Sequence, residues 1–204
     1  MSELRNALAD ISAIRIQVAR DTQFRGFGPA SIAASGALAL LVAAAQSHFG
    51  HHNVDFSAFI RVWVSTAFVT VVLTAAEMIS RARRVHSEFA SEMIYAALEQ
   101  FLPAIVVSIL LAVVLDRVAV RDLWMLPGLW QLLFSLGVFA SRRFLPTPMV
   151  WVGIWYLACG LASLMIESGT TTFSPWIMGI PFGIGQLLVA AVLHSCTERS
   201  GEDA

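Results

Sequence analysis

The sequence predicts an all-α membrane protein: a six-transmembrane-helix bundle, built as three in-out-in hairpins, with an N-terminal amphipathic interfacial helix. Three observations carry this prediction. Apolar residues make up 57% of the chain and charged residues 13%, whereas a soluble globular chain has about 25% charged residues. Charge-poor apolar runs of about 20 residues recur, and each is long enough to cross a hydrocarbon core. The runs are continuously apolar, which favours helices over a membrane barrel.

Composition narrows the class further. The chain of 204 residues is assigned to a single polytopic membrane domain, residues 1–204. Its net charge is −1 and arginine supplies every basic residue, so nothing indicates a nucleic-acid partner. The two cysteines, Cys159 and Cys196, are too few for a disulfide or zinc framework. We therefore expect no cofactor.

The N-terminal segment, residues 2–22, is expected to form a helix that lies on the membrane. Apolar residues recur in it at three- and four-residue spacing from Leu4 to Val18, and charges of both signs separate them. A helix of this kind belongs in the interface plane. It either anchors the bundle or docks a cytoplasmic protein partner, and the sequence leaves both alternatives open.

The membrane spans follow in order. We expect them at residues 29–47, 56–80, 101–115, 123–141, 145–166 and 175–195. In the first span Ser31, Ser35 and Ala39 form a face of small residues that lets a neighbouring helix approach closely. A polar helix over 87–100 precedes the third span, and Pro103 is expected in the first turn of that span, where a missing N–H is tolerated.

The distribution of arginine predicts the orientation. Only Arg61, Arg117 and Arg121 lie on one side of the predicted spans, and the other ten arginines lie on the opposite side. Because arginine accumulates on the cytoplasmic side, both termini are expected in the cytoplasm, with the protein in a bacterial inner (plasma) membrane. Trp124 and Trp176 then lie at the outer interface, where indole rings are favoured.

Two stretches resemble each other and suggest an internal repeat. Residues 124–143 and 176–195 each carry Trp, Pro, Gly and then Gln-Leu-Leu, and Phe-Leu-Pro occurs one span earlier in both cases, at 101–103 and 144–146. Gln131 and Gln186 are expected to occupy equivalent places. Their amides either hold helices together or line a ligand site near the middle of the bilayer.

The candidate ligand-binding residues come from these polar and aromatic positions. They are Gln131, Gln186, Trp124, Trp130, Trp176 and Glu77. Glu77 is the only acid well inside a predicted span, and ionisable groups there are often functional. It also precedes Arg81 by four residues, the order that favours a structural ion pair. The sequence supports both roles equally.

The loop after the first span holds His48, His51 and His52. This spacing is similar to the H-x-x-H-H pattern of membrane di-iron hydroxylases and desaturases, but the chain has five histidines in all, and His86 and His194 lie far away. That family is rejected. No tight metal site is expected in the loop, and only weak binding of zinc or copper is left open. No nucleophile–base pair, zinc-protease motif or phosphate-binding loop is present.

These observations predict a non-enzymatic membrane module that binds a partner protein, a lipid or a small apolar ligand. The alternative is a small oligomeric transporter with a midplane site at the two glutamines. Membrane lipids, a second copy of the chain and a cytoplasmic protein are the partners to consider.

Overall fold

A computed structural model describes residues 28–49, 56–85, 88–143, 145–166 and 174–202. Side chains are described for these residues except 56–57, 78–85, 88–98, 100–101, 143 and 196–202. The predicted interfacial helix, residues 2–22, lies outside the described residues, as do His51 and His52.

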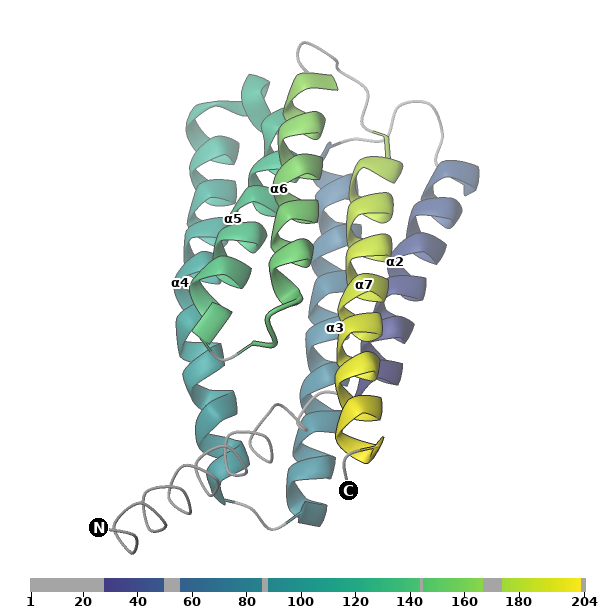
Figure 1. The fold of residues 1–204 in the computed structure, drawn as a ribbon. Coiled ribbons are helices and arrows are strands. Elements are labelled where there is room, and N and C mark those ends of the chain that lie inside the picture. The colour runs from purple at the N-terminus through teal and green to yellow at the C-terminus, as the bar shows by residue number, and fades with distance from the viewer. Residues whose placement is uncertain (1–27, 50–55, 86–87, 144, 167–173, 203–204) are drawn as a thin grey trace, which may run out of the picture.

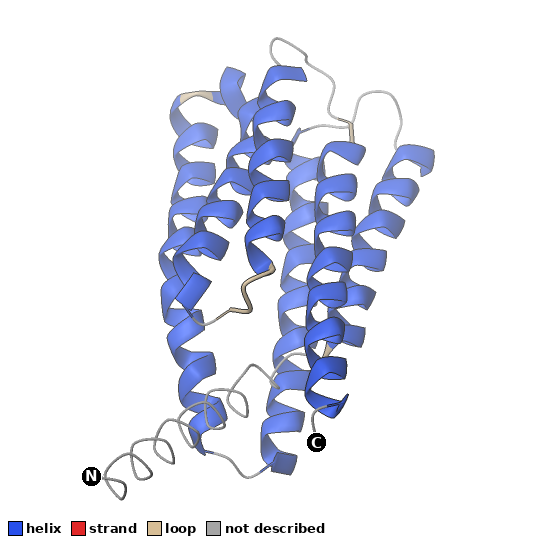
Figure 2. Cartoon of the chain, in the orientation of Figure 1, coloured by secondary structure: helices blue, strands red, loops and turns tan. Residues whose placement is uncertain are grey.

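The described chain is helical and contains no strand (Figure 2). Its six α-helices alternate in direction along one common axis (Figure 1). They are α2 (Pro29–Phe49), α3 (Phe56–Val85), α4 (Glu88–Val118), α5 (Leu126–Ala140), α6 (Met149–Ile166) and α7 (Trp176–Glu202). Two short 3-10 helices, η1 (Val120–Met125) and η2 (Ser141–Arg143), flank α5. The predicted all-α class is confirmed.

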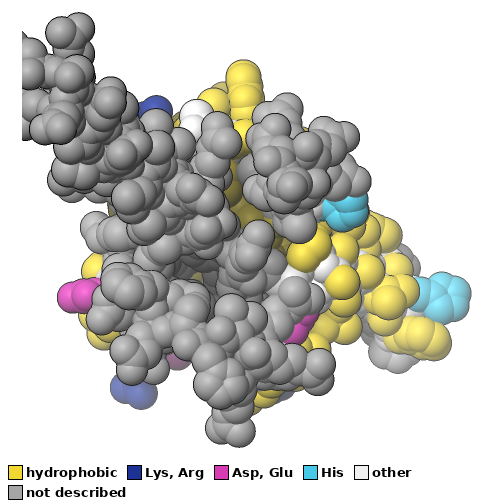
Figure 3. Space-filling view, turned by 60° about the horizontal axis from the view of Figure 1, so that its bottom comes forward, with side chains coloured by type: hydrophobic (Ala, Val, Ile, Leu, Met, Phe, Trp, Pro, Cys, Tyr) yellow, Lys and Arg dark blue, Asp and Glu magenta, His cyan; other side chains and the backbone are white. Residues whose placement is uncertain are grey.

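Five stretches of the described chain are long and apolar enough to cross a membrane. They are Pro29–Phe49, Ala58–Glu77, Val120–Ala140, Met149–Ile166 and Trp176–Ser195. Large apolar side chains cover the outside of the bundle, among them Phe68, Leu110 and Met165, which are more than half exposed. Hydrophobic side chains also predominate among the described residues in the oblique view from the bottom of the bundle (Figure 3). Such a surface fits a lipid environment, and the chain is a helical protein with several membrane-length helices.

One predicted boundary is wrong. The polar helix over 87–100 and the span over 101–115 form a single helix, α4, and Pro103 lies inside it instead of in a first turn. A proline removes the hydrogen bond to the carbonyl four residues earlier, here that of Glu99. Glu99 is exposed, so solvent can satisfy that carbonyl and the helix continues.

A second difference concerns the predicted span 145–166, whose helix begins only at Met149. Residues 145–148 form a turn instead, in which the Met149 N–H donates to the carbonyl of Pro146 at 2.9 Å. Pro146 and Pro148 lack N–H groups, and each also disfavours helical geometry in the residue before it, which explains the late start.

Small residues allow the close packing of two helix pairs, α2 with α7 and α5 with α6. A Cβ added to Gly36 of α2 would lie 2.8 Å from the carbonyl oxygen of Gly183 in α7. Likewise, a Cβ on Gly160 of α6 would lie 2.9 Å from the carbonyl oxygen of Gly128 in α5. The predicted small-residue face of the first span lies in the contact between α2 and α7, where Ser35 and Ala39 are buried. Backbones that approach this closely are typical of membrane helix pairs.

Candidate functional site

The interior of the bundle is organised around a proline in α7. Pro181 is buried inside this helix and has no N–H, so the carbonyl of Ile177, four residues earlier, loses its normal helical partner. The side chain of Gln131, from α5, supplies the missing donor. Its Nε2 donates to the Ile177 carbonyl oxygen at 2.9 Å, and the Gln131 side chain is fully buried.

The amide oxygen of Gln131 faces a third helix. It lies 3.5 Å from the hydroxyl of Ser163 in α6, and that hydroxyl also lies 2.8 Å from the Cys159 carbonyl. A hydroxyl has one proton to donate, so the shorter bond to Cys159 is the stronger one. The bond to Ile177 determines the orientation of the Gln131 amide, because a flipped amide would place its oxygen against the Ile177 carbonyl oxygen. Gln131 thus joins α5, α6 and α7.

Other polar side chains also bond to backbone carbonyls of neighbouring helices. Trp155 Nε1 donates to the carbonyl of Pro181 at 3.0 Å, Trp130 Nε1 to that of Ser108 at 3.1 Å, and the Ser135 hydroxyl to that of Gly153 at 2.8 Å. These bonds connect α6 to α7, α5 to α4 and α5 to α6. Polar groups in hydrocarbon gain by finding such partners, and these bonds hold the bundle together.

Gln186 has a different environment from Gln131. It is half-buried on α7, and its Cβ lies next to Gly36 of α2. No hydrogen bond joins its amide to another residue in the part of the chain that the structure describes. The two glutamines therefore match in sequence without matching in burial or bonding.

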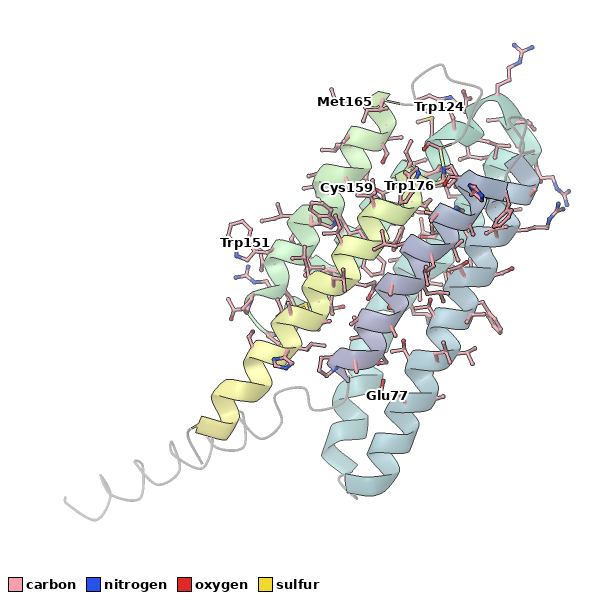
Figure 4. All side chains as sticks on the ribbon, turned by 90° about the vertical axis from the view of Figure 1, so that its right-hand side faces the viewer. Glu77, Trp124, Trp151, Cys159, Met165 and Trp176 are labelled. Atoms are coloured by element: carbon pink, nitrogen blue, oxygen red, sulfur yellow. The ribbon has the colours of Figure 1, made fainter. Side chains whose placement is uncertain are left out.

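The remaining candidate residues lie on several elements. Trp124 is half-buried on η1 and Trp176 is 39% exposed at the start of α7. Both lie toward one end of the bundle, and Glu77 of α3 lies in the other half (Figure 4). Glu77 is half-buried, and the side chain of its predicted partner Arg81 lies outside the described ones, so that ion pair stays a prediction.

The histidine loop is described only at its start. His48, at the end of α2, is exposed and its ring lies 5.0 Å from that of Phe49. Within the described residues no group of three or more His, Cys, Asp or Glu is placed to hold a metal ion. Metal binding by the complete loop stays an open question.

A groove between α4, α5 and α6 is the feature that the sequence did not reveal. Val107 and Leu111 of α4 line one side, Leu157 and Leu161 of α6 line the other, and α5 contributes side chains along 129–139. Its volume is about 430 Å³ and its lining is almost wholly apolar. None of the six predicted site residues lines it. A groove needs three helices in a fixed arrangement, and an apolar sequence pattern alone cannot show it.

The groove opens on the outside of the bundle. Val107, Leu136 and Leu161 on its lining are between 47% and 61% exposed. The hydroxyl of Ser135, its one polar side chain, is already bonded to Gly153. The groove thus offers a ligand dispersion contacts and apolar burial, and no polar recognition along its length.

Comparison with known proteins places the chain in no family: no protein-family model, curated protein or solved structure matches it.

Proposed function

We propose that the chain is a non-enzymatic membrane module with six transmembrane helices, and that it binds a membrane lipid through an acyl chain held in the groove between α4, α5 and α6. The sixth span in this proposal is the apolar part of α4. Leu102, Ile109 and Val114 of this part are each more than half exposed, which suits a lipid-facing helix. The arginine bias supports cytoplasmic termini in a bacterial inner membrane.

The apolar groove is the observation that carries the proposal. An acyl chain is apolar and without hydrogen-bonding groups, so it leaves no polar group unpaired in a groove whose lining offers no partner. A polar metabolite would lose its hydration there without compensation. A cytoplasmic protein partner is less well supported, because the groove and the exposed side chains beside it are apolar.

Transport through a midplane site at Gln131 and Gln186 is the second candidate, and it has less support. The Gln131 amide nitrogen is bonded to Ile177 and the side chain is fully buried. A transported solute would have to break that bond and uncover the Ile177 carbonyl at each cycle. Gln186 is half-buried, and its amide makes no such bond to another described residue.

A lipid carrying a photoreactive acyl chain tests the proposal. The full-length protein is reconstituted in vesicles that contain the lipid, irradiated, and analysed by peptide mass spectrometry. Labelling should concentrate on peptides of α4, α5 and α6 that line the groove. Val107→Trp should fill the groove and reduce this labelling, whereas Val106→Trp, on an exposed neighbour that does not line it, should leave labelling unchanged. Uniform labelling of all exposed helices, unaffected by Val107→Trp, would refute the proposal.

A further inference from the structure

The position of the groove along α5 indicates which lipids can reach it. The lining runs from Leu129 to Phe139, a length of about 15 Å at the helical rise per residue. That is half of a hydrocarbon core about 30 Å thick, the depth of one leaflet. Phe139 lies three residues before Arg142 of η2, so the groove ends close to this short helix.

The η2 end of the groove has the features of a membrane surface. Arg142 is exposed, and Trp151, near the start of α6, is 71% exposed. Arginine and tryptophan together are typical of the interface, where a long side chain reaches the headgroups and an indole ring sits among them. A lipid whose chain fills the groove from this side therefore has its headgroup near η2.

The charges at the two ends of the groove differ. Between Leu123 and Ile166 the only charged residues are Arg142 and Arg143, both in η2. At the opposite end, the sequence places Asp116 beside Arg117 and Arg121 beside Asp122. Trp130 bonds to Ser108 and α4 and α5 run in opposite directions (Figure 1), so Glu99, nine residues before Ser108, lies level with Phe139 at the η2 end. Two arginines there outnumber one acid, whereas the opposite end has two residues of each sign. That end complements an anionic headgroup, and the other end is balanced.

We propose that the groove selects an anionic phospholipid from the leaflet on the η2 side, with the acyl chain along α5 and the phosphate at Arg142. This inference rests on the proposed lipid-binding function. Arg142 contributes charge-assisted hydrogen bonds to the phosphate oxygens, and the net negative charge of the headgroup separates this lipid from a zwitterionic one. The apolar lining binds chains of both lipids, so the preference comes from the headgroup end alone.

Native mass spectrometry of the full-length, delipidated protein tests this inference. The protein is mixed with equal amounts of phosphatidylglycerol and phosphatidylethanolamine in mild detergent, and the bound lipids are counted. We expect phosphatidylglycerol to be retained preferentially. Arg142→Gln should lower that preference about fivefold, the effect of one arginine near an anionic surface, and leave retention of phosphatidylethanolamine unchanged. Arg121→Gln, at the balanced end, is the matched control and should change neither.

The outcomes separate the inference from the function on which it rests. Equal retention of both lipids by the unaltered protein, or equal loss of both in Arg142→Gln, would overturn the headgroup selection and leave the groove as a lipid site. Retention that Val107→Trp does not reduce would overturn the groove itself. Circular dichroism of each variant establishes that the helices are intact. Arg142→Lys keeps the positive charge and should therefore retain most of the preference for phosphatidylglycerol.

Discussion

Replacing Gln131 by leucine should destabilise the bundle more than the loss of an ordinary membrane hydrogen bond would. The substitution roughly keeps side-chain volume and removes the donor to the Ile177 carbonyl, which lies 2.9 Å from Gln131 Nε2. Membrane hydrogen bonds average about 0.6 kcal/mol. Here the carbonyl lacks its usual helical donor, because Pro181 replaces the residue whose N–H would have bonded to it. An unsatisfied buried polar group costs about 1–3 kcal/mol, and we expect a loss of about 1–2 kcal/mol.

A double-mutant cycle isolates the role of the proline. Pro181→Ala restores an N–H that can bond to the Ile177 carbonyl within α7. In that background Gln131→Leu should cost about 0.5 kcal/mol or less, which gives a coupling free energy near 1 kcal/mol. The assay is reversible unfolding in mixed micelles, followed by circular dichroism. Gln186→Leu is the control, since its amide has no partner among the described residues, and it should change stability by less than about 0.5 kcal/mol.

The outcome that refutes this reasoning is additivity. If the free-energy costs of Gln131→Leu and Pro181→Ala add to within about 0.5 kcal/mol, the two sites are independent. The glutamine then stabilises the bundle by some route other than the carbonyl that the proline leaves free.

Three further predictions test the packing, the topology and the carboxylate. Gly160→Ala should destabilise the protein by about 1–3 kcal/mol, because the new methyl group would approach the α5 backbone to 2.9 Å. Thermal unfolding measures this loss, and Ala162→Leu, at an exposed position of the same helix, is the control that should be neutral. In intact cells an impermeant thiol reagent should label a cysteine placed at Gly50 but not one at Ser87, and the reverse pattern would contradict cytoplasmic termini. Glu77→Gln should cost about 0–1 kcal/mol if the carboxylate is only a structural partner, and loss of a proton-coupled flux with the fold intact would contradict that role.

The sequence was sufficient to predict the all-α class and most of the helices, and the reasons are physical. Long apolar runs leave a chain in lipid little choice except a helix, and the small residues at Ser35 and Ala39 identified a packing face that the structure buries. The bond from Gln131 to Ile177 was not predictable, because it joins residues 46 positions apart. It depends on which helix lies beside which. The sequence did show the polar side chain and the proline, the two signals that could have suggested a repaired carbonyl.

The expected equivalence of the two glutamines shows a limit of short sequence repeats. Gln131 and Gln186 share the residues that follow them, but only Gln131 faces a helix with a missing N–H. Gln186 instead faces the small residues of α2, where Gly36 leaves room for a larger side chain. Partner helices determine what an amide does, and a repeat of a few residues carries no information about partners.

The length of α3 has a consequence for how its charges act in solution. Its membrane-length stretch ends at Glu77 and the helix continues to Val85, about 12 Å further along the axis. The headgroup layer on one side of a bilayer is about 5–8 Å thick. If this stretch spans the membrane as proposed above, the last turn of α3 extends past that layer into water. Ionic screening there acts over about 8 Å at physiological salt. Electrostatic interactions at this end of α3 should therefore weaken with ionic strength more than interactions close to the hydrocarbon core.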